Sequence, residues 1–168
     1  MRSVTAFYNE EKRHVEYAVE KYSKMLFRIC FSILCNREDA EDALQETFLK
    51  YMTKAPLFRD SDHEKAWLIK VATNTSKNMC RYNTRRECTD ISELKEIGVE
   101  DADISSLNVV LKLDVKYRIV LDLFYIEGYK SREIAQILDI SPAAVRKRLQ
   151  YARQELKKEI ERTGLNDK

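Results

Sequence analysis

Apolar residues in the amino-terminal half of the chain recur at the three- and four-residue steps of amphipathic helices. Over the first 35 residues these steps follow one face and predict a single long helix. A second helix is expected over residues 38–52, with an acidic outer face, and a third over residues 64–86, with a basic end. A polar loop, residues 58–63, precedes the third helix. The inward positions of the first helix are Val15, Val19, Tyr22, Leu26, Ile29 and Ile33, and those of the third are Ala66, Trp67, Val71 and Ala72.

The periodicity fails between Glu87 and Asn108, where acidic residues are frequent. Poor periodicity with high net charge is typical of a linker, so we expect a domain boundary here. Three further helices are expected beyond it, over residues 109–126, 131–138 and 142–160. The pattern therefore predicts an all-α protein in which two helical domains are joined by an acidic linker, over residues 1–86, 87–108 and 109–168.

The composition agrees with a helical chain. Three glycines and two prolines are few for 168 residues, and sheets with tight hairpins need turn residues of these types. Apolar residues make up 44% of the chain, which is enough for a packed core, and charged residues make up 35%. The charged fraction exceeds the average of about 25% for globular domains, so the surface must be highly charged.

The formal net charge of +2 hides a sorting of charge by segment. Residues 36–50 carry five acids and two bases, a net charge of −3, whereas residues 77–86 carry four bases and no acid. Residues 87–107 have a net charge of −6, and residues 141–158 have a net charge of +5. Alternating acidic and basic blocks indicate several different partners.

The four cysteines form no CxxC pair and the chain has two histidines, so no zinc ligand set is expected. Cys30 and Cys35 lie in an apolar stretch and are expected to be buried, reduced and structural rather than redox sensors. No signal peptide and no run of about 18 apolar residues is present. We therefore expect a cytoplasmic protein without membrane insertion, metal or cofactor.

Residues 131–149 have the pattern of a helix-turn-helix. Ala135 is small where the two helices must approach closely, and Ile140 fills the turn. Gly128 is expected to end the preceding helix, and Ser141 can cap the last helix with Pro142 at its first position.

The last helix has an apolar stripe and an opposite polar side. The stripe contains Val145, Leu149, Ala152, Leu156 and Ile160. Counting about 100° per residue leaves the other side facing outward, with Ala143, Lys147, Gln150, Tyr151 and Gln154, and with Arg146 beside them. Arginine, lysine and glutamine can reach base edges and phosphates in a major groove, so DNA binding is favoured over a merely solvated face.

Two motifs in the first domain carry a resemblance to a known family. Residues 39–50, DAEDALQETFLK, resemble the core-binding segment of bacterial sigma factors of the extracytoplasmic-function group. Residues 66–78, AWLIKVATNTSKN, with the basic residues that follow, resemble the segment of that group that melts promoters and reads the minus-ten element. With the helix-turn-helix, the resemblance covers residues 7–86 and 109–160.

The resemblance implies a sigma factor that binds core RNA polymerase and promoter DNA. It implies contacts with a coiled coil of the polymerase's largest subunit and with its flap, and it allows an anti-sigma factor as a further partner. The loop 58–63 matches the place where the family captures an unstacked base. The implied residues are Asp39, Asp42, Gln45 and Glu46 for core polymerase; Lys70, Asn74, Lys77, Asn78, Arg81, Arg85 and Arg86 for the minus-ten element; and Ser141, Ala143, Arg146, Lys147, Arg148, Gln150, Tyr151 and Arg153 for the minus-thirty-five element.

The chain departs from the family's pattern at three places. Asp139 stands where the turn commonly has glycine, so a left-handed backbone there would be carried by an aspartate. Tyr151 stands where a basic residue is frequent, and the loop 59–63 is unusually acidic.

Trp67 could stack on a base, but a core role is favoured because it shares a face with Val71.

Two other functions fit parts of the sequence. A stand-alone helix-turn-helix regulator would leave the acidic helix and the residues from Asn74 to Asn78 unexplained. A nucleic-acid enzyme would need a carboxylate or metal cluster in a cleft, whereas the acids here lie on a helix face and in the linker. The linker itself fits either a soluble spacer or a mimic of RNA phosphates in the polymerase channel.

Overall fold

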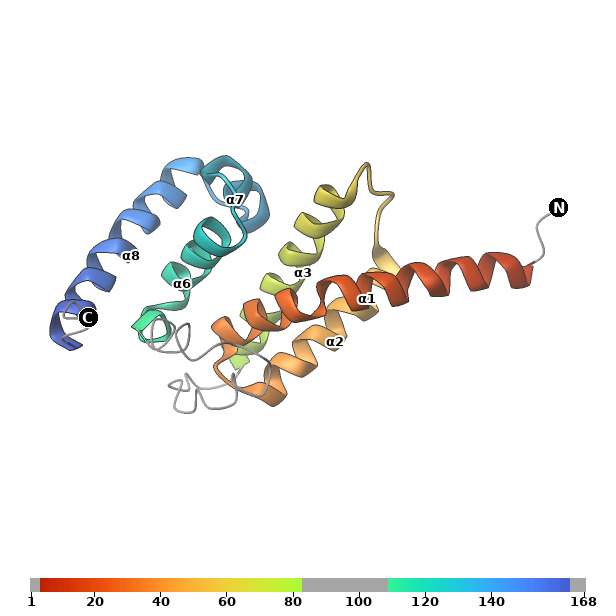
Figure 1. Ribbon diagram of the computed structural model, residues 1–168, viewed down its shortest axis with the longest axis horizontal. Coiled ribbons are helices and arrows are strands. Elements are labelled where there is room, and N and C mark those ends of the chain that lie inside the picture. Colours follow the sequence, from red (N-terminus) through yellow and green to blue (C-terminus); the bar gives the residue numbers. More distant parts are fainter. Residues whose placement is uncertain (1–3, 83–108, 164–168) are drawn as a thin grey trace.

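The computed structural model describes residues 4–82 and 109–163, and the secondary structure in these ranges is all helical (Figure 1). The predicted all-α class is therefore confirmed for the described residues, while the linker 87–108 lies outside them. The first three helices are α1 (Val4–Leu34), α2 (Arg37–Lys54) and α3 (Ser61–Tyr82). The second group contains α6 (Val115–Leu121), the π-helical turn η1 (Asp122–Ile126), α7 (Ser131–Leu138) and α8 (Pro142–Thr163).

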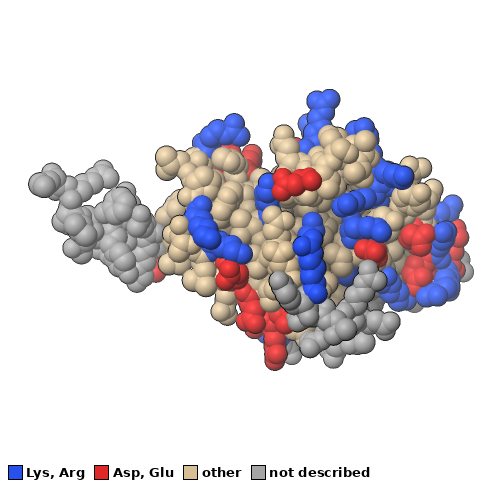
Figure 2. Space-filling view, turned by 180° about the vertical axis from the view of Figure 1, so that it is seen from behind, with Lys and Arg blue, Asp and Glu red and all other residues tan. Residues whose placement is uncertain are grey.

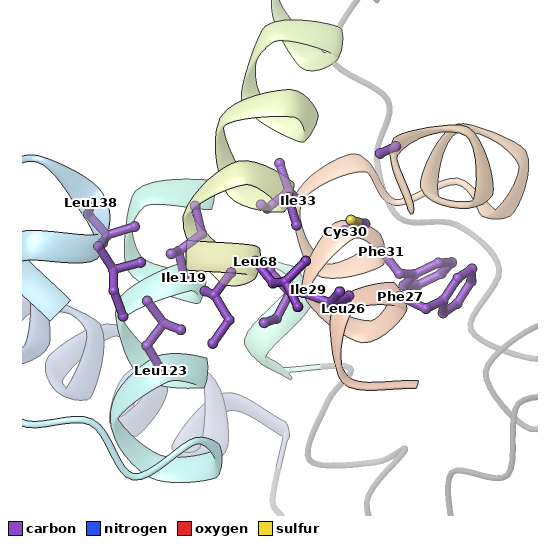
Figure 3. Packing of buried hydrophobic residues seen from close by; sticks show 14 of the residues in the cluster. Leu26, Phe27, Ile29, Cys30, Phe31, Ile33, Leu68, Ile119, Leu123 and Leu138 are labelled. Carbon is purple, nitrogen blue, oxygen red and sulfur yellow. The ribbon is translucent and has the colours of Figure 1, made fainter. Parts of the chain in front are cut away.

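Helix α1 packs against α2 and α3 and also against α6 of the second group. As predicted, Tyr22, Leu26, Ile29 and Ile33 are buried. The predicted inward position of Val19 is wrong, because Val19 is 39% exposed and the neighbouring Ala18 is buried instead. Buried side chains from α1, α3, α6 and α7 form one continuous cluster (Figure 3), so the two helical groups share a core.

Helices α2 and α3 begin where short polar side chains cap them. The Asn36 side chain accepts a hydrogen bond from Asp39 N at 2.9 Å, and the Asp60 side chain accepts one from His63 N at 2.7 Å. The buried face of α3 differs from the prediction, since Ala66, Trp67 and Val71 are only partly buried. The fully buried positions are Leu68, Ile69, Ala72, Thr73 and Ser76. Small hydroxyl side chains complete this face, and a pattern built on apolar residues alone misses them.

The helix predicted over residues 109–126 is interrupted. Helical structure at 109–111 gives way to a turn, and α6 begins only after Asp114, whose side chain accepts a hydrogen bond from Lys116 N at 3.1 Å. An aspartate that caps a new helix competes with continuation of the old one. The carboxyl end is the π-helical turn η1, and Gly128, with φ +74°, ends it as predicted.

The predicted helix-turn-helix is present. Helix α7 has the predicted bounds, and the Ser141 hydroxyl accepts a hydrogen bond from Ala144 N at 3.1 Å at the start of α8. Asp139 has φ +53°, so this aspartate does carry the left-handed backbone that the turn requires. Val145, Leu149 and Ala152 are buried, which confirms the inward stripe over the first three turns of α8.

An ion-pair cluster joins the two groups of helices. Arg28 of α1 contacts Asp122 at 3.3 Å and also Glu127, and Lys65 of α3 contacts Glu127 at 2.7 Å. Burial raises the pKa of Asp122 to about 6 although Arg28 lies beside it, and the Asp122 Oδ2 atom has no hydrogen-bond partner. Burial also opposes ionisation of Glu127, but hydrogen bonds from Lys65 and Arg28 outweigh it and lower its pKa. We name these four side chains the interdomain ion cluster.

The cysteines meet the prediction only in part. Cys30 is buried and free, and burial raises the pKa of its thiol to about 11, as expected for an unreactive structural residue. Cys35 is disulfide-bonded, so the expectation of a reduced thiol is wrong there. Its sulfur accepts a hydrogen bond from Arg118 Nη1 at 2.9 Å.

None of the helices that the structure describes has both the length and the hydropathy of a membrane span.

We predict that Asp122→Asn stabilises the protein at neutral pH. The pKa of about 6 in the folded chain, against an ordinary 3.8, makes the ionised side chain unfavourable by about 3 kcal/mol above pH 6. Because the folded state holds this proton more tightly, the parent gains stability as pH falls from about 6 to 4. The advantage of the Asp122→Asn variant over the parent should therefore shrink across that range in thermal melts. A variant that is less stable than the parent at pH 7.5 would contradict this account.

Candidate functional site

The outer side of α2 carries the residues that the sequence predicts for core polymerase. Asp42, Gln45 and Glu46 are exposed, while Asp39 is partly buried near the start of the helix. The opposite side of α2 is buried against the core through Ala40, Ala43, Thr47, Phe48 and Tyr51. The three exposed residues therefore lie together on one surface.

Two apolar side chains that the sequence analysis missed continue this surface. Leu49 and Met52 are 56% and 62% exposed, and they lie on the same side of α2 as Asp42, Gln45 and Glu46, since both are one or two helical turns after Gln45. The spacing was visible in the sequence, but an apolar residue on an acidic face does not by itself indicate a contact. We call Asp42, Gln45, Glu46, Leu49 and Met52 the α2 surface.

One side of α3 collects the residues predicted for the minus-ten element. Their steps of three and four residues place them on one face, which lies away from the buried Leu68, Ile69 and Ala72. Asn74, Asn78 and Arg81 are exposed, whereas Lys70 and Lys77 are partly buried. Arg85 and Arg86 lie outside the described residues. We call this set the α3 surface, and its described members are Lys70, Asn74, Lys77, Asn78 and Arg81.

The helix-turn-helix covers part of the α3 surface, because α3 packs against α7. Lys70 Nζ lies 2.7 Å from a carboxylate oxygen of Asp139, the residue at the turn between α7 and α8. Burial lowers the pKa of Lys77, and the positive charges of Arg148 and Arg81 lower it further. Cations from both helical groups thus gather at this contact.

Aromatic side chains gather at the loop that connects α2 to α3. The Phe58 ring lies nearly parallel to that of Tyr51, with centroids 6.0 Å apart, and meets the edges of Trp67 and His63 at 5.8 and 5.5 Å. Leu57 beside it is 98% exposed. Trp67 is partly buried and packs on the core, in agreement with the favoured core role, while it also supports Phe58.

The outer side of α8 forms a shallow depression of about 460 Å³. Its lining consists of the residues predicted to face outward, Ala143, Lys147, Gln150, Tyr151 and Gln154, together with Arg146 beside them. Lys147 and Arg146 supply positive charge, and two glutamines supply amide groups that can pair with base edges. On the face of the molecule shown in Figure 2, more of the charged surface comes from lysine and arginine than from aspartate and glutamate.

The remaining residues predicted for the minus-thirty-five element lie elsewhere. Ser141 caps α8, and Arg148 lies near Lys77 at the contact with α3. Arg153 points toward η1, where its Nε donates to the Tyr125 hydroxyl at 2.7 Å and its guanidinium lies 5.7 Å from the Phe124 and Tyr125 rings. The structure therefore brings together five of the eight predicted residues and not these three.

Comparison with known proteins assigns the chain to a family. The models named Sigma-70 region 2 and Sigma-70, region 4 match residues 18–86 and 107–156. The ECF RNA polymerase sigma factor SigW of Bacillus subtilis is 30% identical over 161 residues, which cover 84% of this chain and 86% of that protein. The chain belongs to the extracytoplasmic-function sigma factors of the sigma-70 family. It directs promoter recognition by RNA polymerase and is an initiation factor rather than an enzyme.

Other relatives agree with this assignment. The ECF RNA polymerase sigma factor SigL of Mycobacterium tuberculosis is 26% identical, with 87% of this chain and 88% of that protein covered. The structure of CnrH in complex with the cytosolic domain of CnrY is similar, with a TM-score of 0.66, 26% identity and 89% of each chain covered. The sigma factor RpoE in complex with the anti-sigma factor NepR, from Bartonella quintana, has a TM-score of 0.68 over 87% of this chain and 96% of that one, and at 18% identity supports the fold alone.

The family assignment decides between the functions that the sequence left open. A stand-alone helix-turn-helix regulator would not account for a match to sigma region 2 over residues 18–86. In this sigma factor α2 and α3 fall within region 2, and α7 and most of α8 fall within region 4. The described residues contain no group of three or more side chains suited to a metal ion.

We predict that Asp139→Gly is tolerated whereas Asp139→Ala is destabilising. Both changes remove the exposed ion pair with Lys70, which contributes little. Glycine adopts φ +53° freely, but alanine there should cost about 1 kcal/mol. Urea unfolding followed by circular dichroism should therefore give a lower midpoint for the alanine variant. Equal midpoints, or a more stable alanine variant, would contradict the role assigned to the turn.

Proposed function

We propose that this sigma factor binds core polymerase through α2 and reads two promoter elements through α3 and α8. The observation that carries the proposal is the separation of surfaces with different chemistry on different helices. The α2 surface is acidic with apolar residues, the α3 surface carries amides and cations, and the depression on α8 carries cations, amides and a tyrosine. Each surface suits one of the three partners that a promoter-specific initiation factor needs.

The partner of the α2 surface is a basic coiled coil of the polymerase's largest subunit. Asp42 and Glu46 supply negative charge for such a partner, with Asp39 at its margin. Leu49 and Met52 supply exposed apolar area beside the charges. Desolvated apolar contacts ringed by complementary charges are typical of specific protein interfaces.

The α3 surface and the loop before it read the minus-ten element. Amide side chains suit base edges, and the cations, including Arg85 and Arg86, suit phosphates. The Phe58 loop offers aromatic rings to an unstacked base. Helix α8 reads the minus-thirty-five element through Arg146, Lys147, Gln150 and Tyr151.

The domain organisation that we propose for this function has a promoter-reading unit at each end of the chain, at residues 1–86 and 109–168, with the acidic linker 87–108 between them. The second unit would also contact the polymerase flap. An anti-sigma factor is a further proposed partner, because RpoE was solved in complex with the anti-sigma factor NepR and CnrH in complex with the cytosolic domain of CnrY. A factor that works on RNA polymerase acts in the cytoplasm, and we propose that location.

We expect Asp42→Lys combined with Glu46→Lys to abolish or strongly weaken binding to core polymerase, because two attractive charges become repulsive. Affinity should fall at least tenfold in a titration of core with the labelled sigma factor. The matched control is Glu16→Lys with Glu20→Lys, which makes the same charge change at two exposed positions of α1. If the α2 variant binds as tightly as the control, the interface is misassigned.

Variants of the α3 surface and of the α8 depression should have different defects in promoter binding and opening. Lys147→Ala should weaken footprints of the holoenzyme over the upstream element, because it removes a cation from the α8 depression. Asn74→Ala with Asn78→Ala should leave that footprint in place and reduce strand opening at the downstream element, measured by permanganate reactivity. Identical defects in both variants would contradict the division between α3 and α8.

A further inference from the structure

The buried carboxylate of Glu64 has no part in the surfaces described so far. Glu64 lies in the first turn of α3, which follows the loop that carries Phe58, and it is only 7% exposed. A carboxylate that is removed from water costs free energy unless its oxygens receive hydrogen bonds or a countercharge. Its partners therefore show what this side chain does.

Both oxygens of Glu64 accept a tyrosine hydroxyl. Tyr22 of α1 donates to Oε2 at 3.0 Å, and Tyr51 of α2 donates to Oε1. His14 Nε2 of α1 lies 3.4 Å from the same Oε1. One carboxylate thus ties α1 and α2 to the beginning of α3, and both tyrosines are 4% exposed.

The hydroxyl of Tyr51 stays protonated, and so it keeps its role as a donor. Burial is the main cause that raises the pKa of Tyr51 well above its ordinary value, and the Glu64 carboxylate beside it raises that pKa further. A charge-assisted hydrogen bond of this kind is stronger than one between neutral groups. The orientation of the Tyr51 ring is therefore set by Glu64.

The Tyr51 ring in turn supports the loop. It lies between the rings of His14 and Phe58, with centroid distances of 6.1 and 6.0 Å and interplanar angles of 20° and 9°. Tyr22 has no ring contact with Phe58 among the described aromatic pairs. The two tyrosines thus bind the same carboxylate. Tyr22 also donates to Ser61 O at 3.4 Å, at the beginning of α3, but only Tyr51 contacts the Phe58 ring.

We propose that Glu64 is a positioning residue for base recognition, which holds Tyr51 so that the Phe58 ring is preformed to stack on an unstacked promoter base. The inference rests on the function proposed above for the loop, and it adds the residue that orders it. Glu64 itself is buried and touches no DNA. A preorganised ring spares the ordering cost at the moment of binding and so strengthens stacking on the unstacked base. Because bases differ in stacking strength, stronger stacking also gives a modest preference at that position.

Tyr51→Phe and Tyr22→Phe form the matched pair that tests this proposal. Each removes one hydroxyl that Glu64 accepts, so both should lower the melting temperature to a similar degree. Only Tyr51→Phe releases the ring that supports Phe58. A purely structural role for Glu64 would make the two variants behave alike in DNA recognition as well.

The measurement is selection of single-stranded DNA from a random pool by holoenzyme assembled with each variant, followed by sequencing. The parent and Tyr22→Phe should enrich the same motif with equal strength. Tyr51→Phe and Glu64→Leu should lose about fivefold in base preference at one position of that motif, the position that Phe58→Ala also loses. If Glu64→Leu does not fold, the tyrosine pair still decides the question.

The outcomes separate the two levels of the proposal. An unchanged motif with Phe58→Ala would show that the loop reads no base, which contradicts the loop's proposed function and the role of Glu64 together. A motif that loses one position with Phe58→Ala but stays complete with Tyr51→Phe contradicts the role of Glu64 alone. Equal losses with Tyr51→Phe and Tyr22→Phe would do the same.

Discussion

A helix in a small bundle buries one side, and this constraint decides which side chains of the sigma factor remain for a partner. Helix α2 buries alanines and aromatic residues, which leaves its acids outside; α8 buries Val145, Leu149 and Ala152, which leaves Arg146 and Lys147 outside. Helix α1 packs against α2 and α3 and reaches the second group through α6, whereas α8 packs against α6 and α7 (Figure 1). The chemistry of each surface follows from which side of its helix these neighbours bury.

The same packing brings α3, which we propose to read the minus-ten element, against α7 of the helix-turn-helix. For Lys70 to reach DNA, its ion pair with Asp139 has to separate; that pair is exposed, so its loss costs little. The interdomain ion cluster is more deeply buried, and loss of Arg28 or Lys65 removes a countercharge from its buried carboxylates. The contact between the helical groups is therefore more sensitive to the loss of these two cations than to the loss of the exposed pair at the turn.

Most of the helix-turn-helix could be predicted from the sequence because its signals are local: the Ser141 cap, Pro142 and the stripe from Val145 act within a few residues. The same holds for the exposed face of α2. Features that depend on contacts between different helices could not be predicted. Arg153, which the resemblance implies for the minus-thirty-five element, donates to Tyr125, and Glu64, which in sequence resembles an ordinary surface charge, is bound by tyrosines from two other helices. The break at Asp114 was readable in principle, but a capping aspartate inside an apolar pattern has no unique meaning.

The central claim is that one chain gives RNA polymerase a promoter specificity with two separated elements. Sequencing of RNA 5′ ends, made in vitro by core polymerase with this sigma factor on fragmented genomic DNA, tests it most directly. The account predicts start sites absent with core alone, each preceded by two conserved blocks at a nearly fixed spacing. Start sites that share a single block, or no new start sites above core alone, would contradict it.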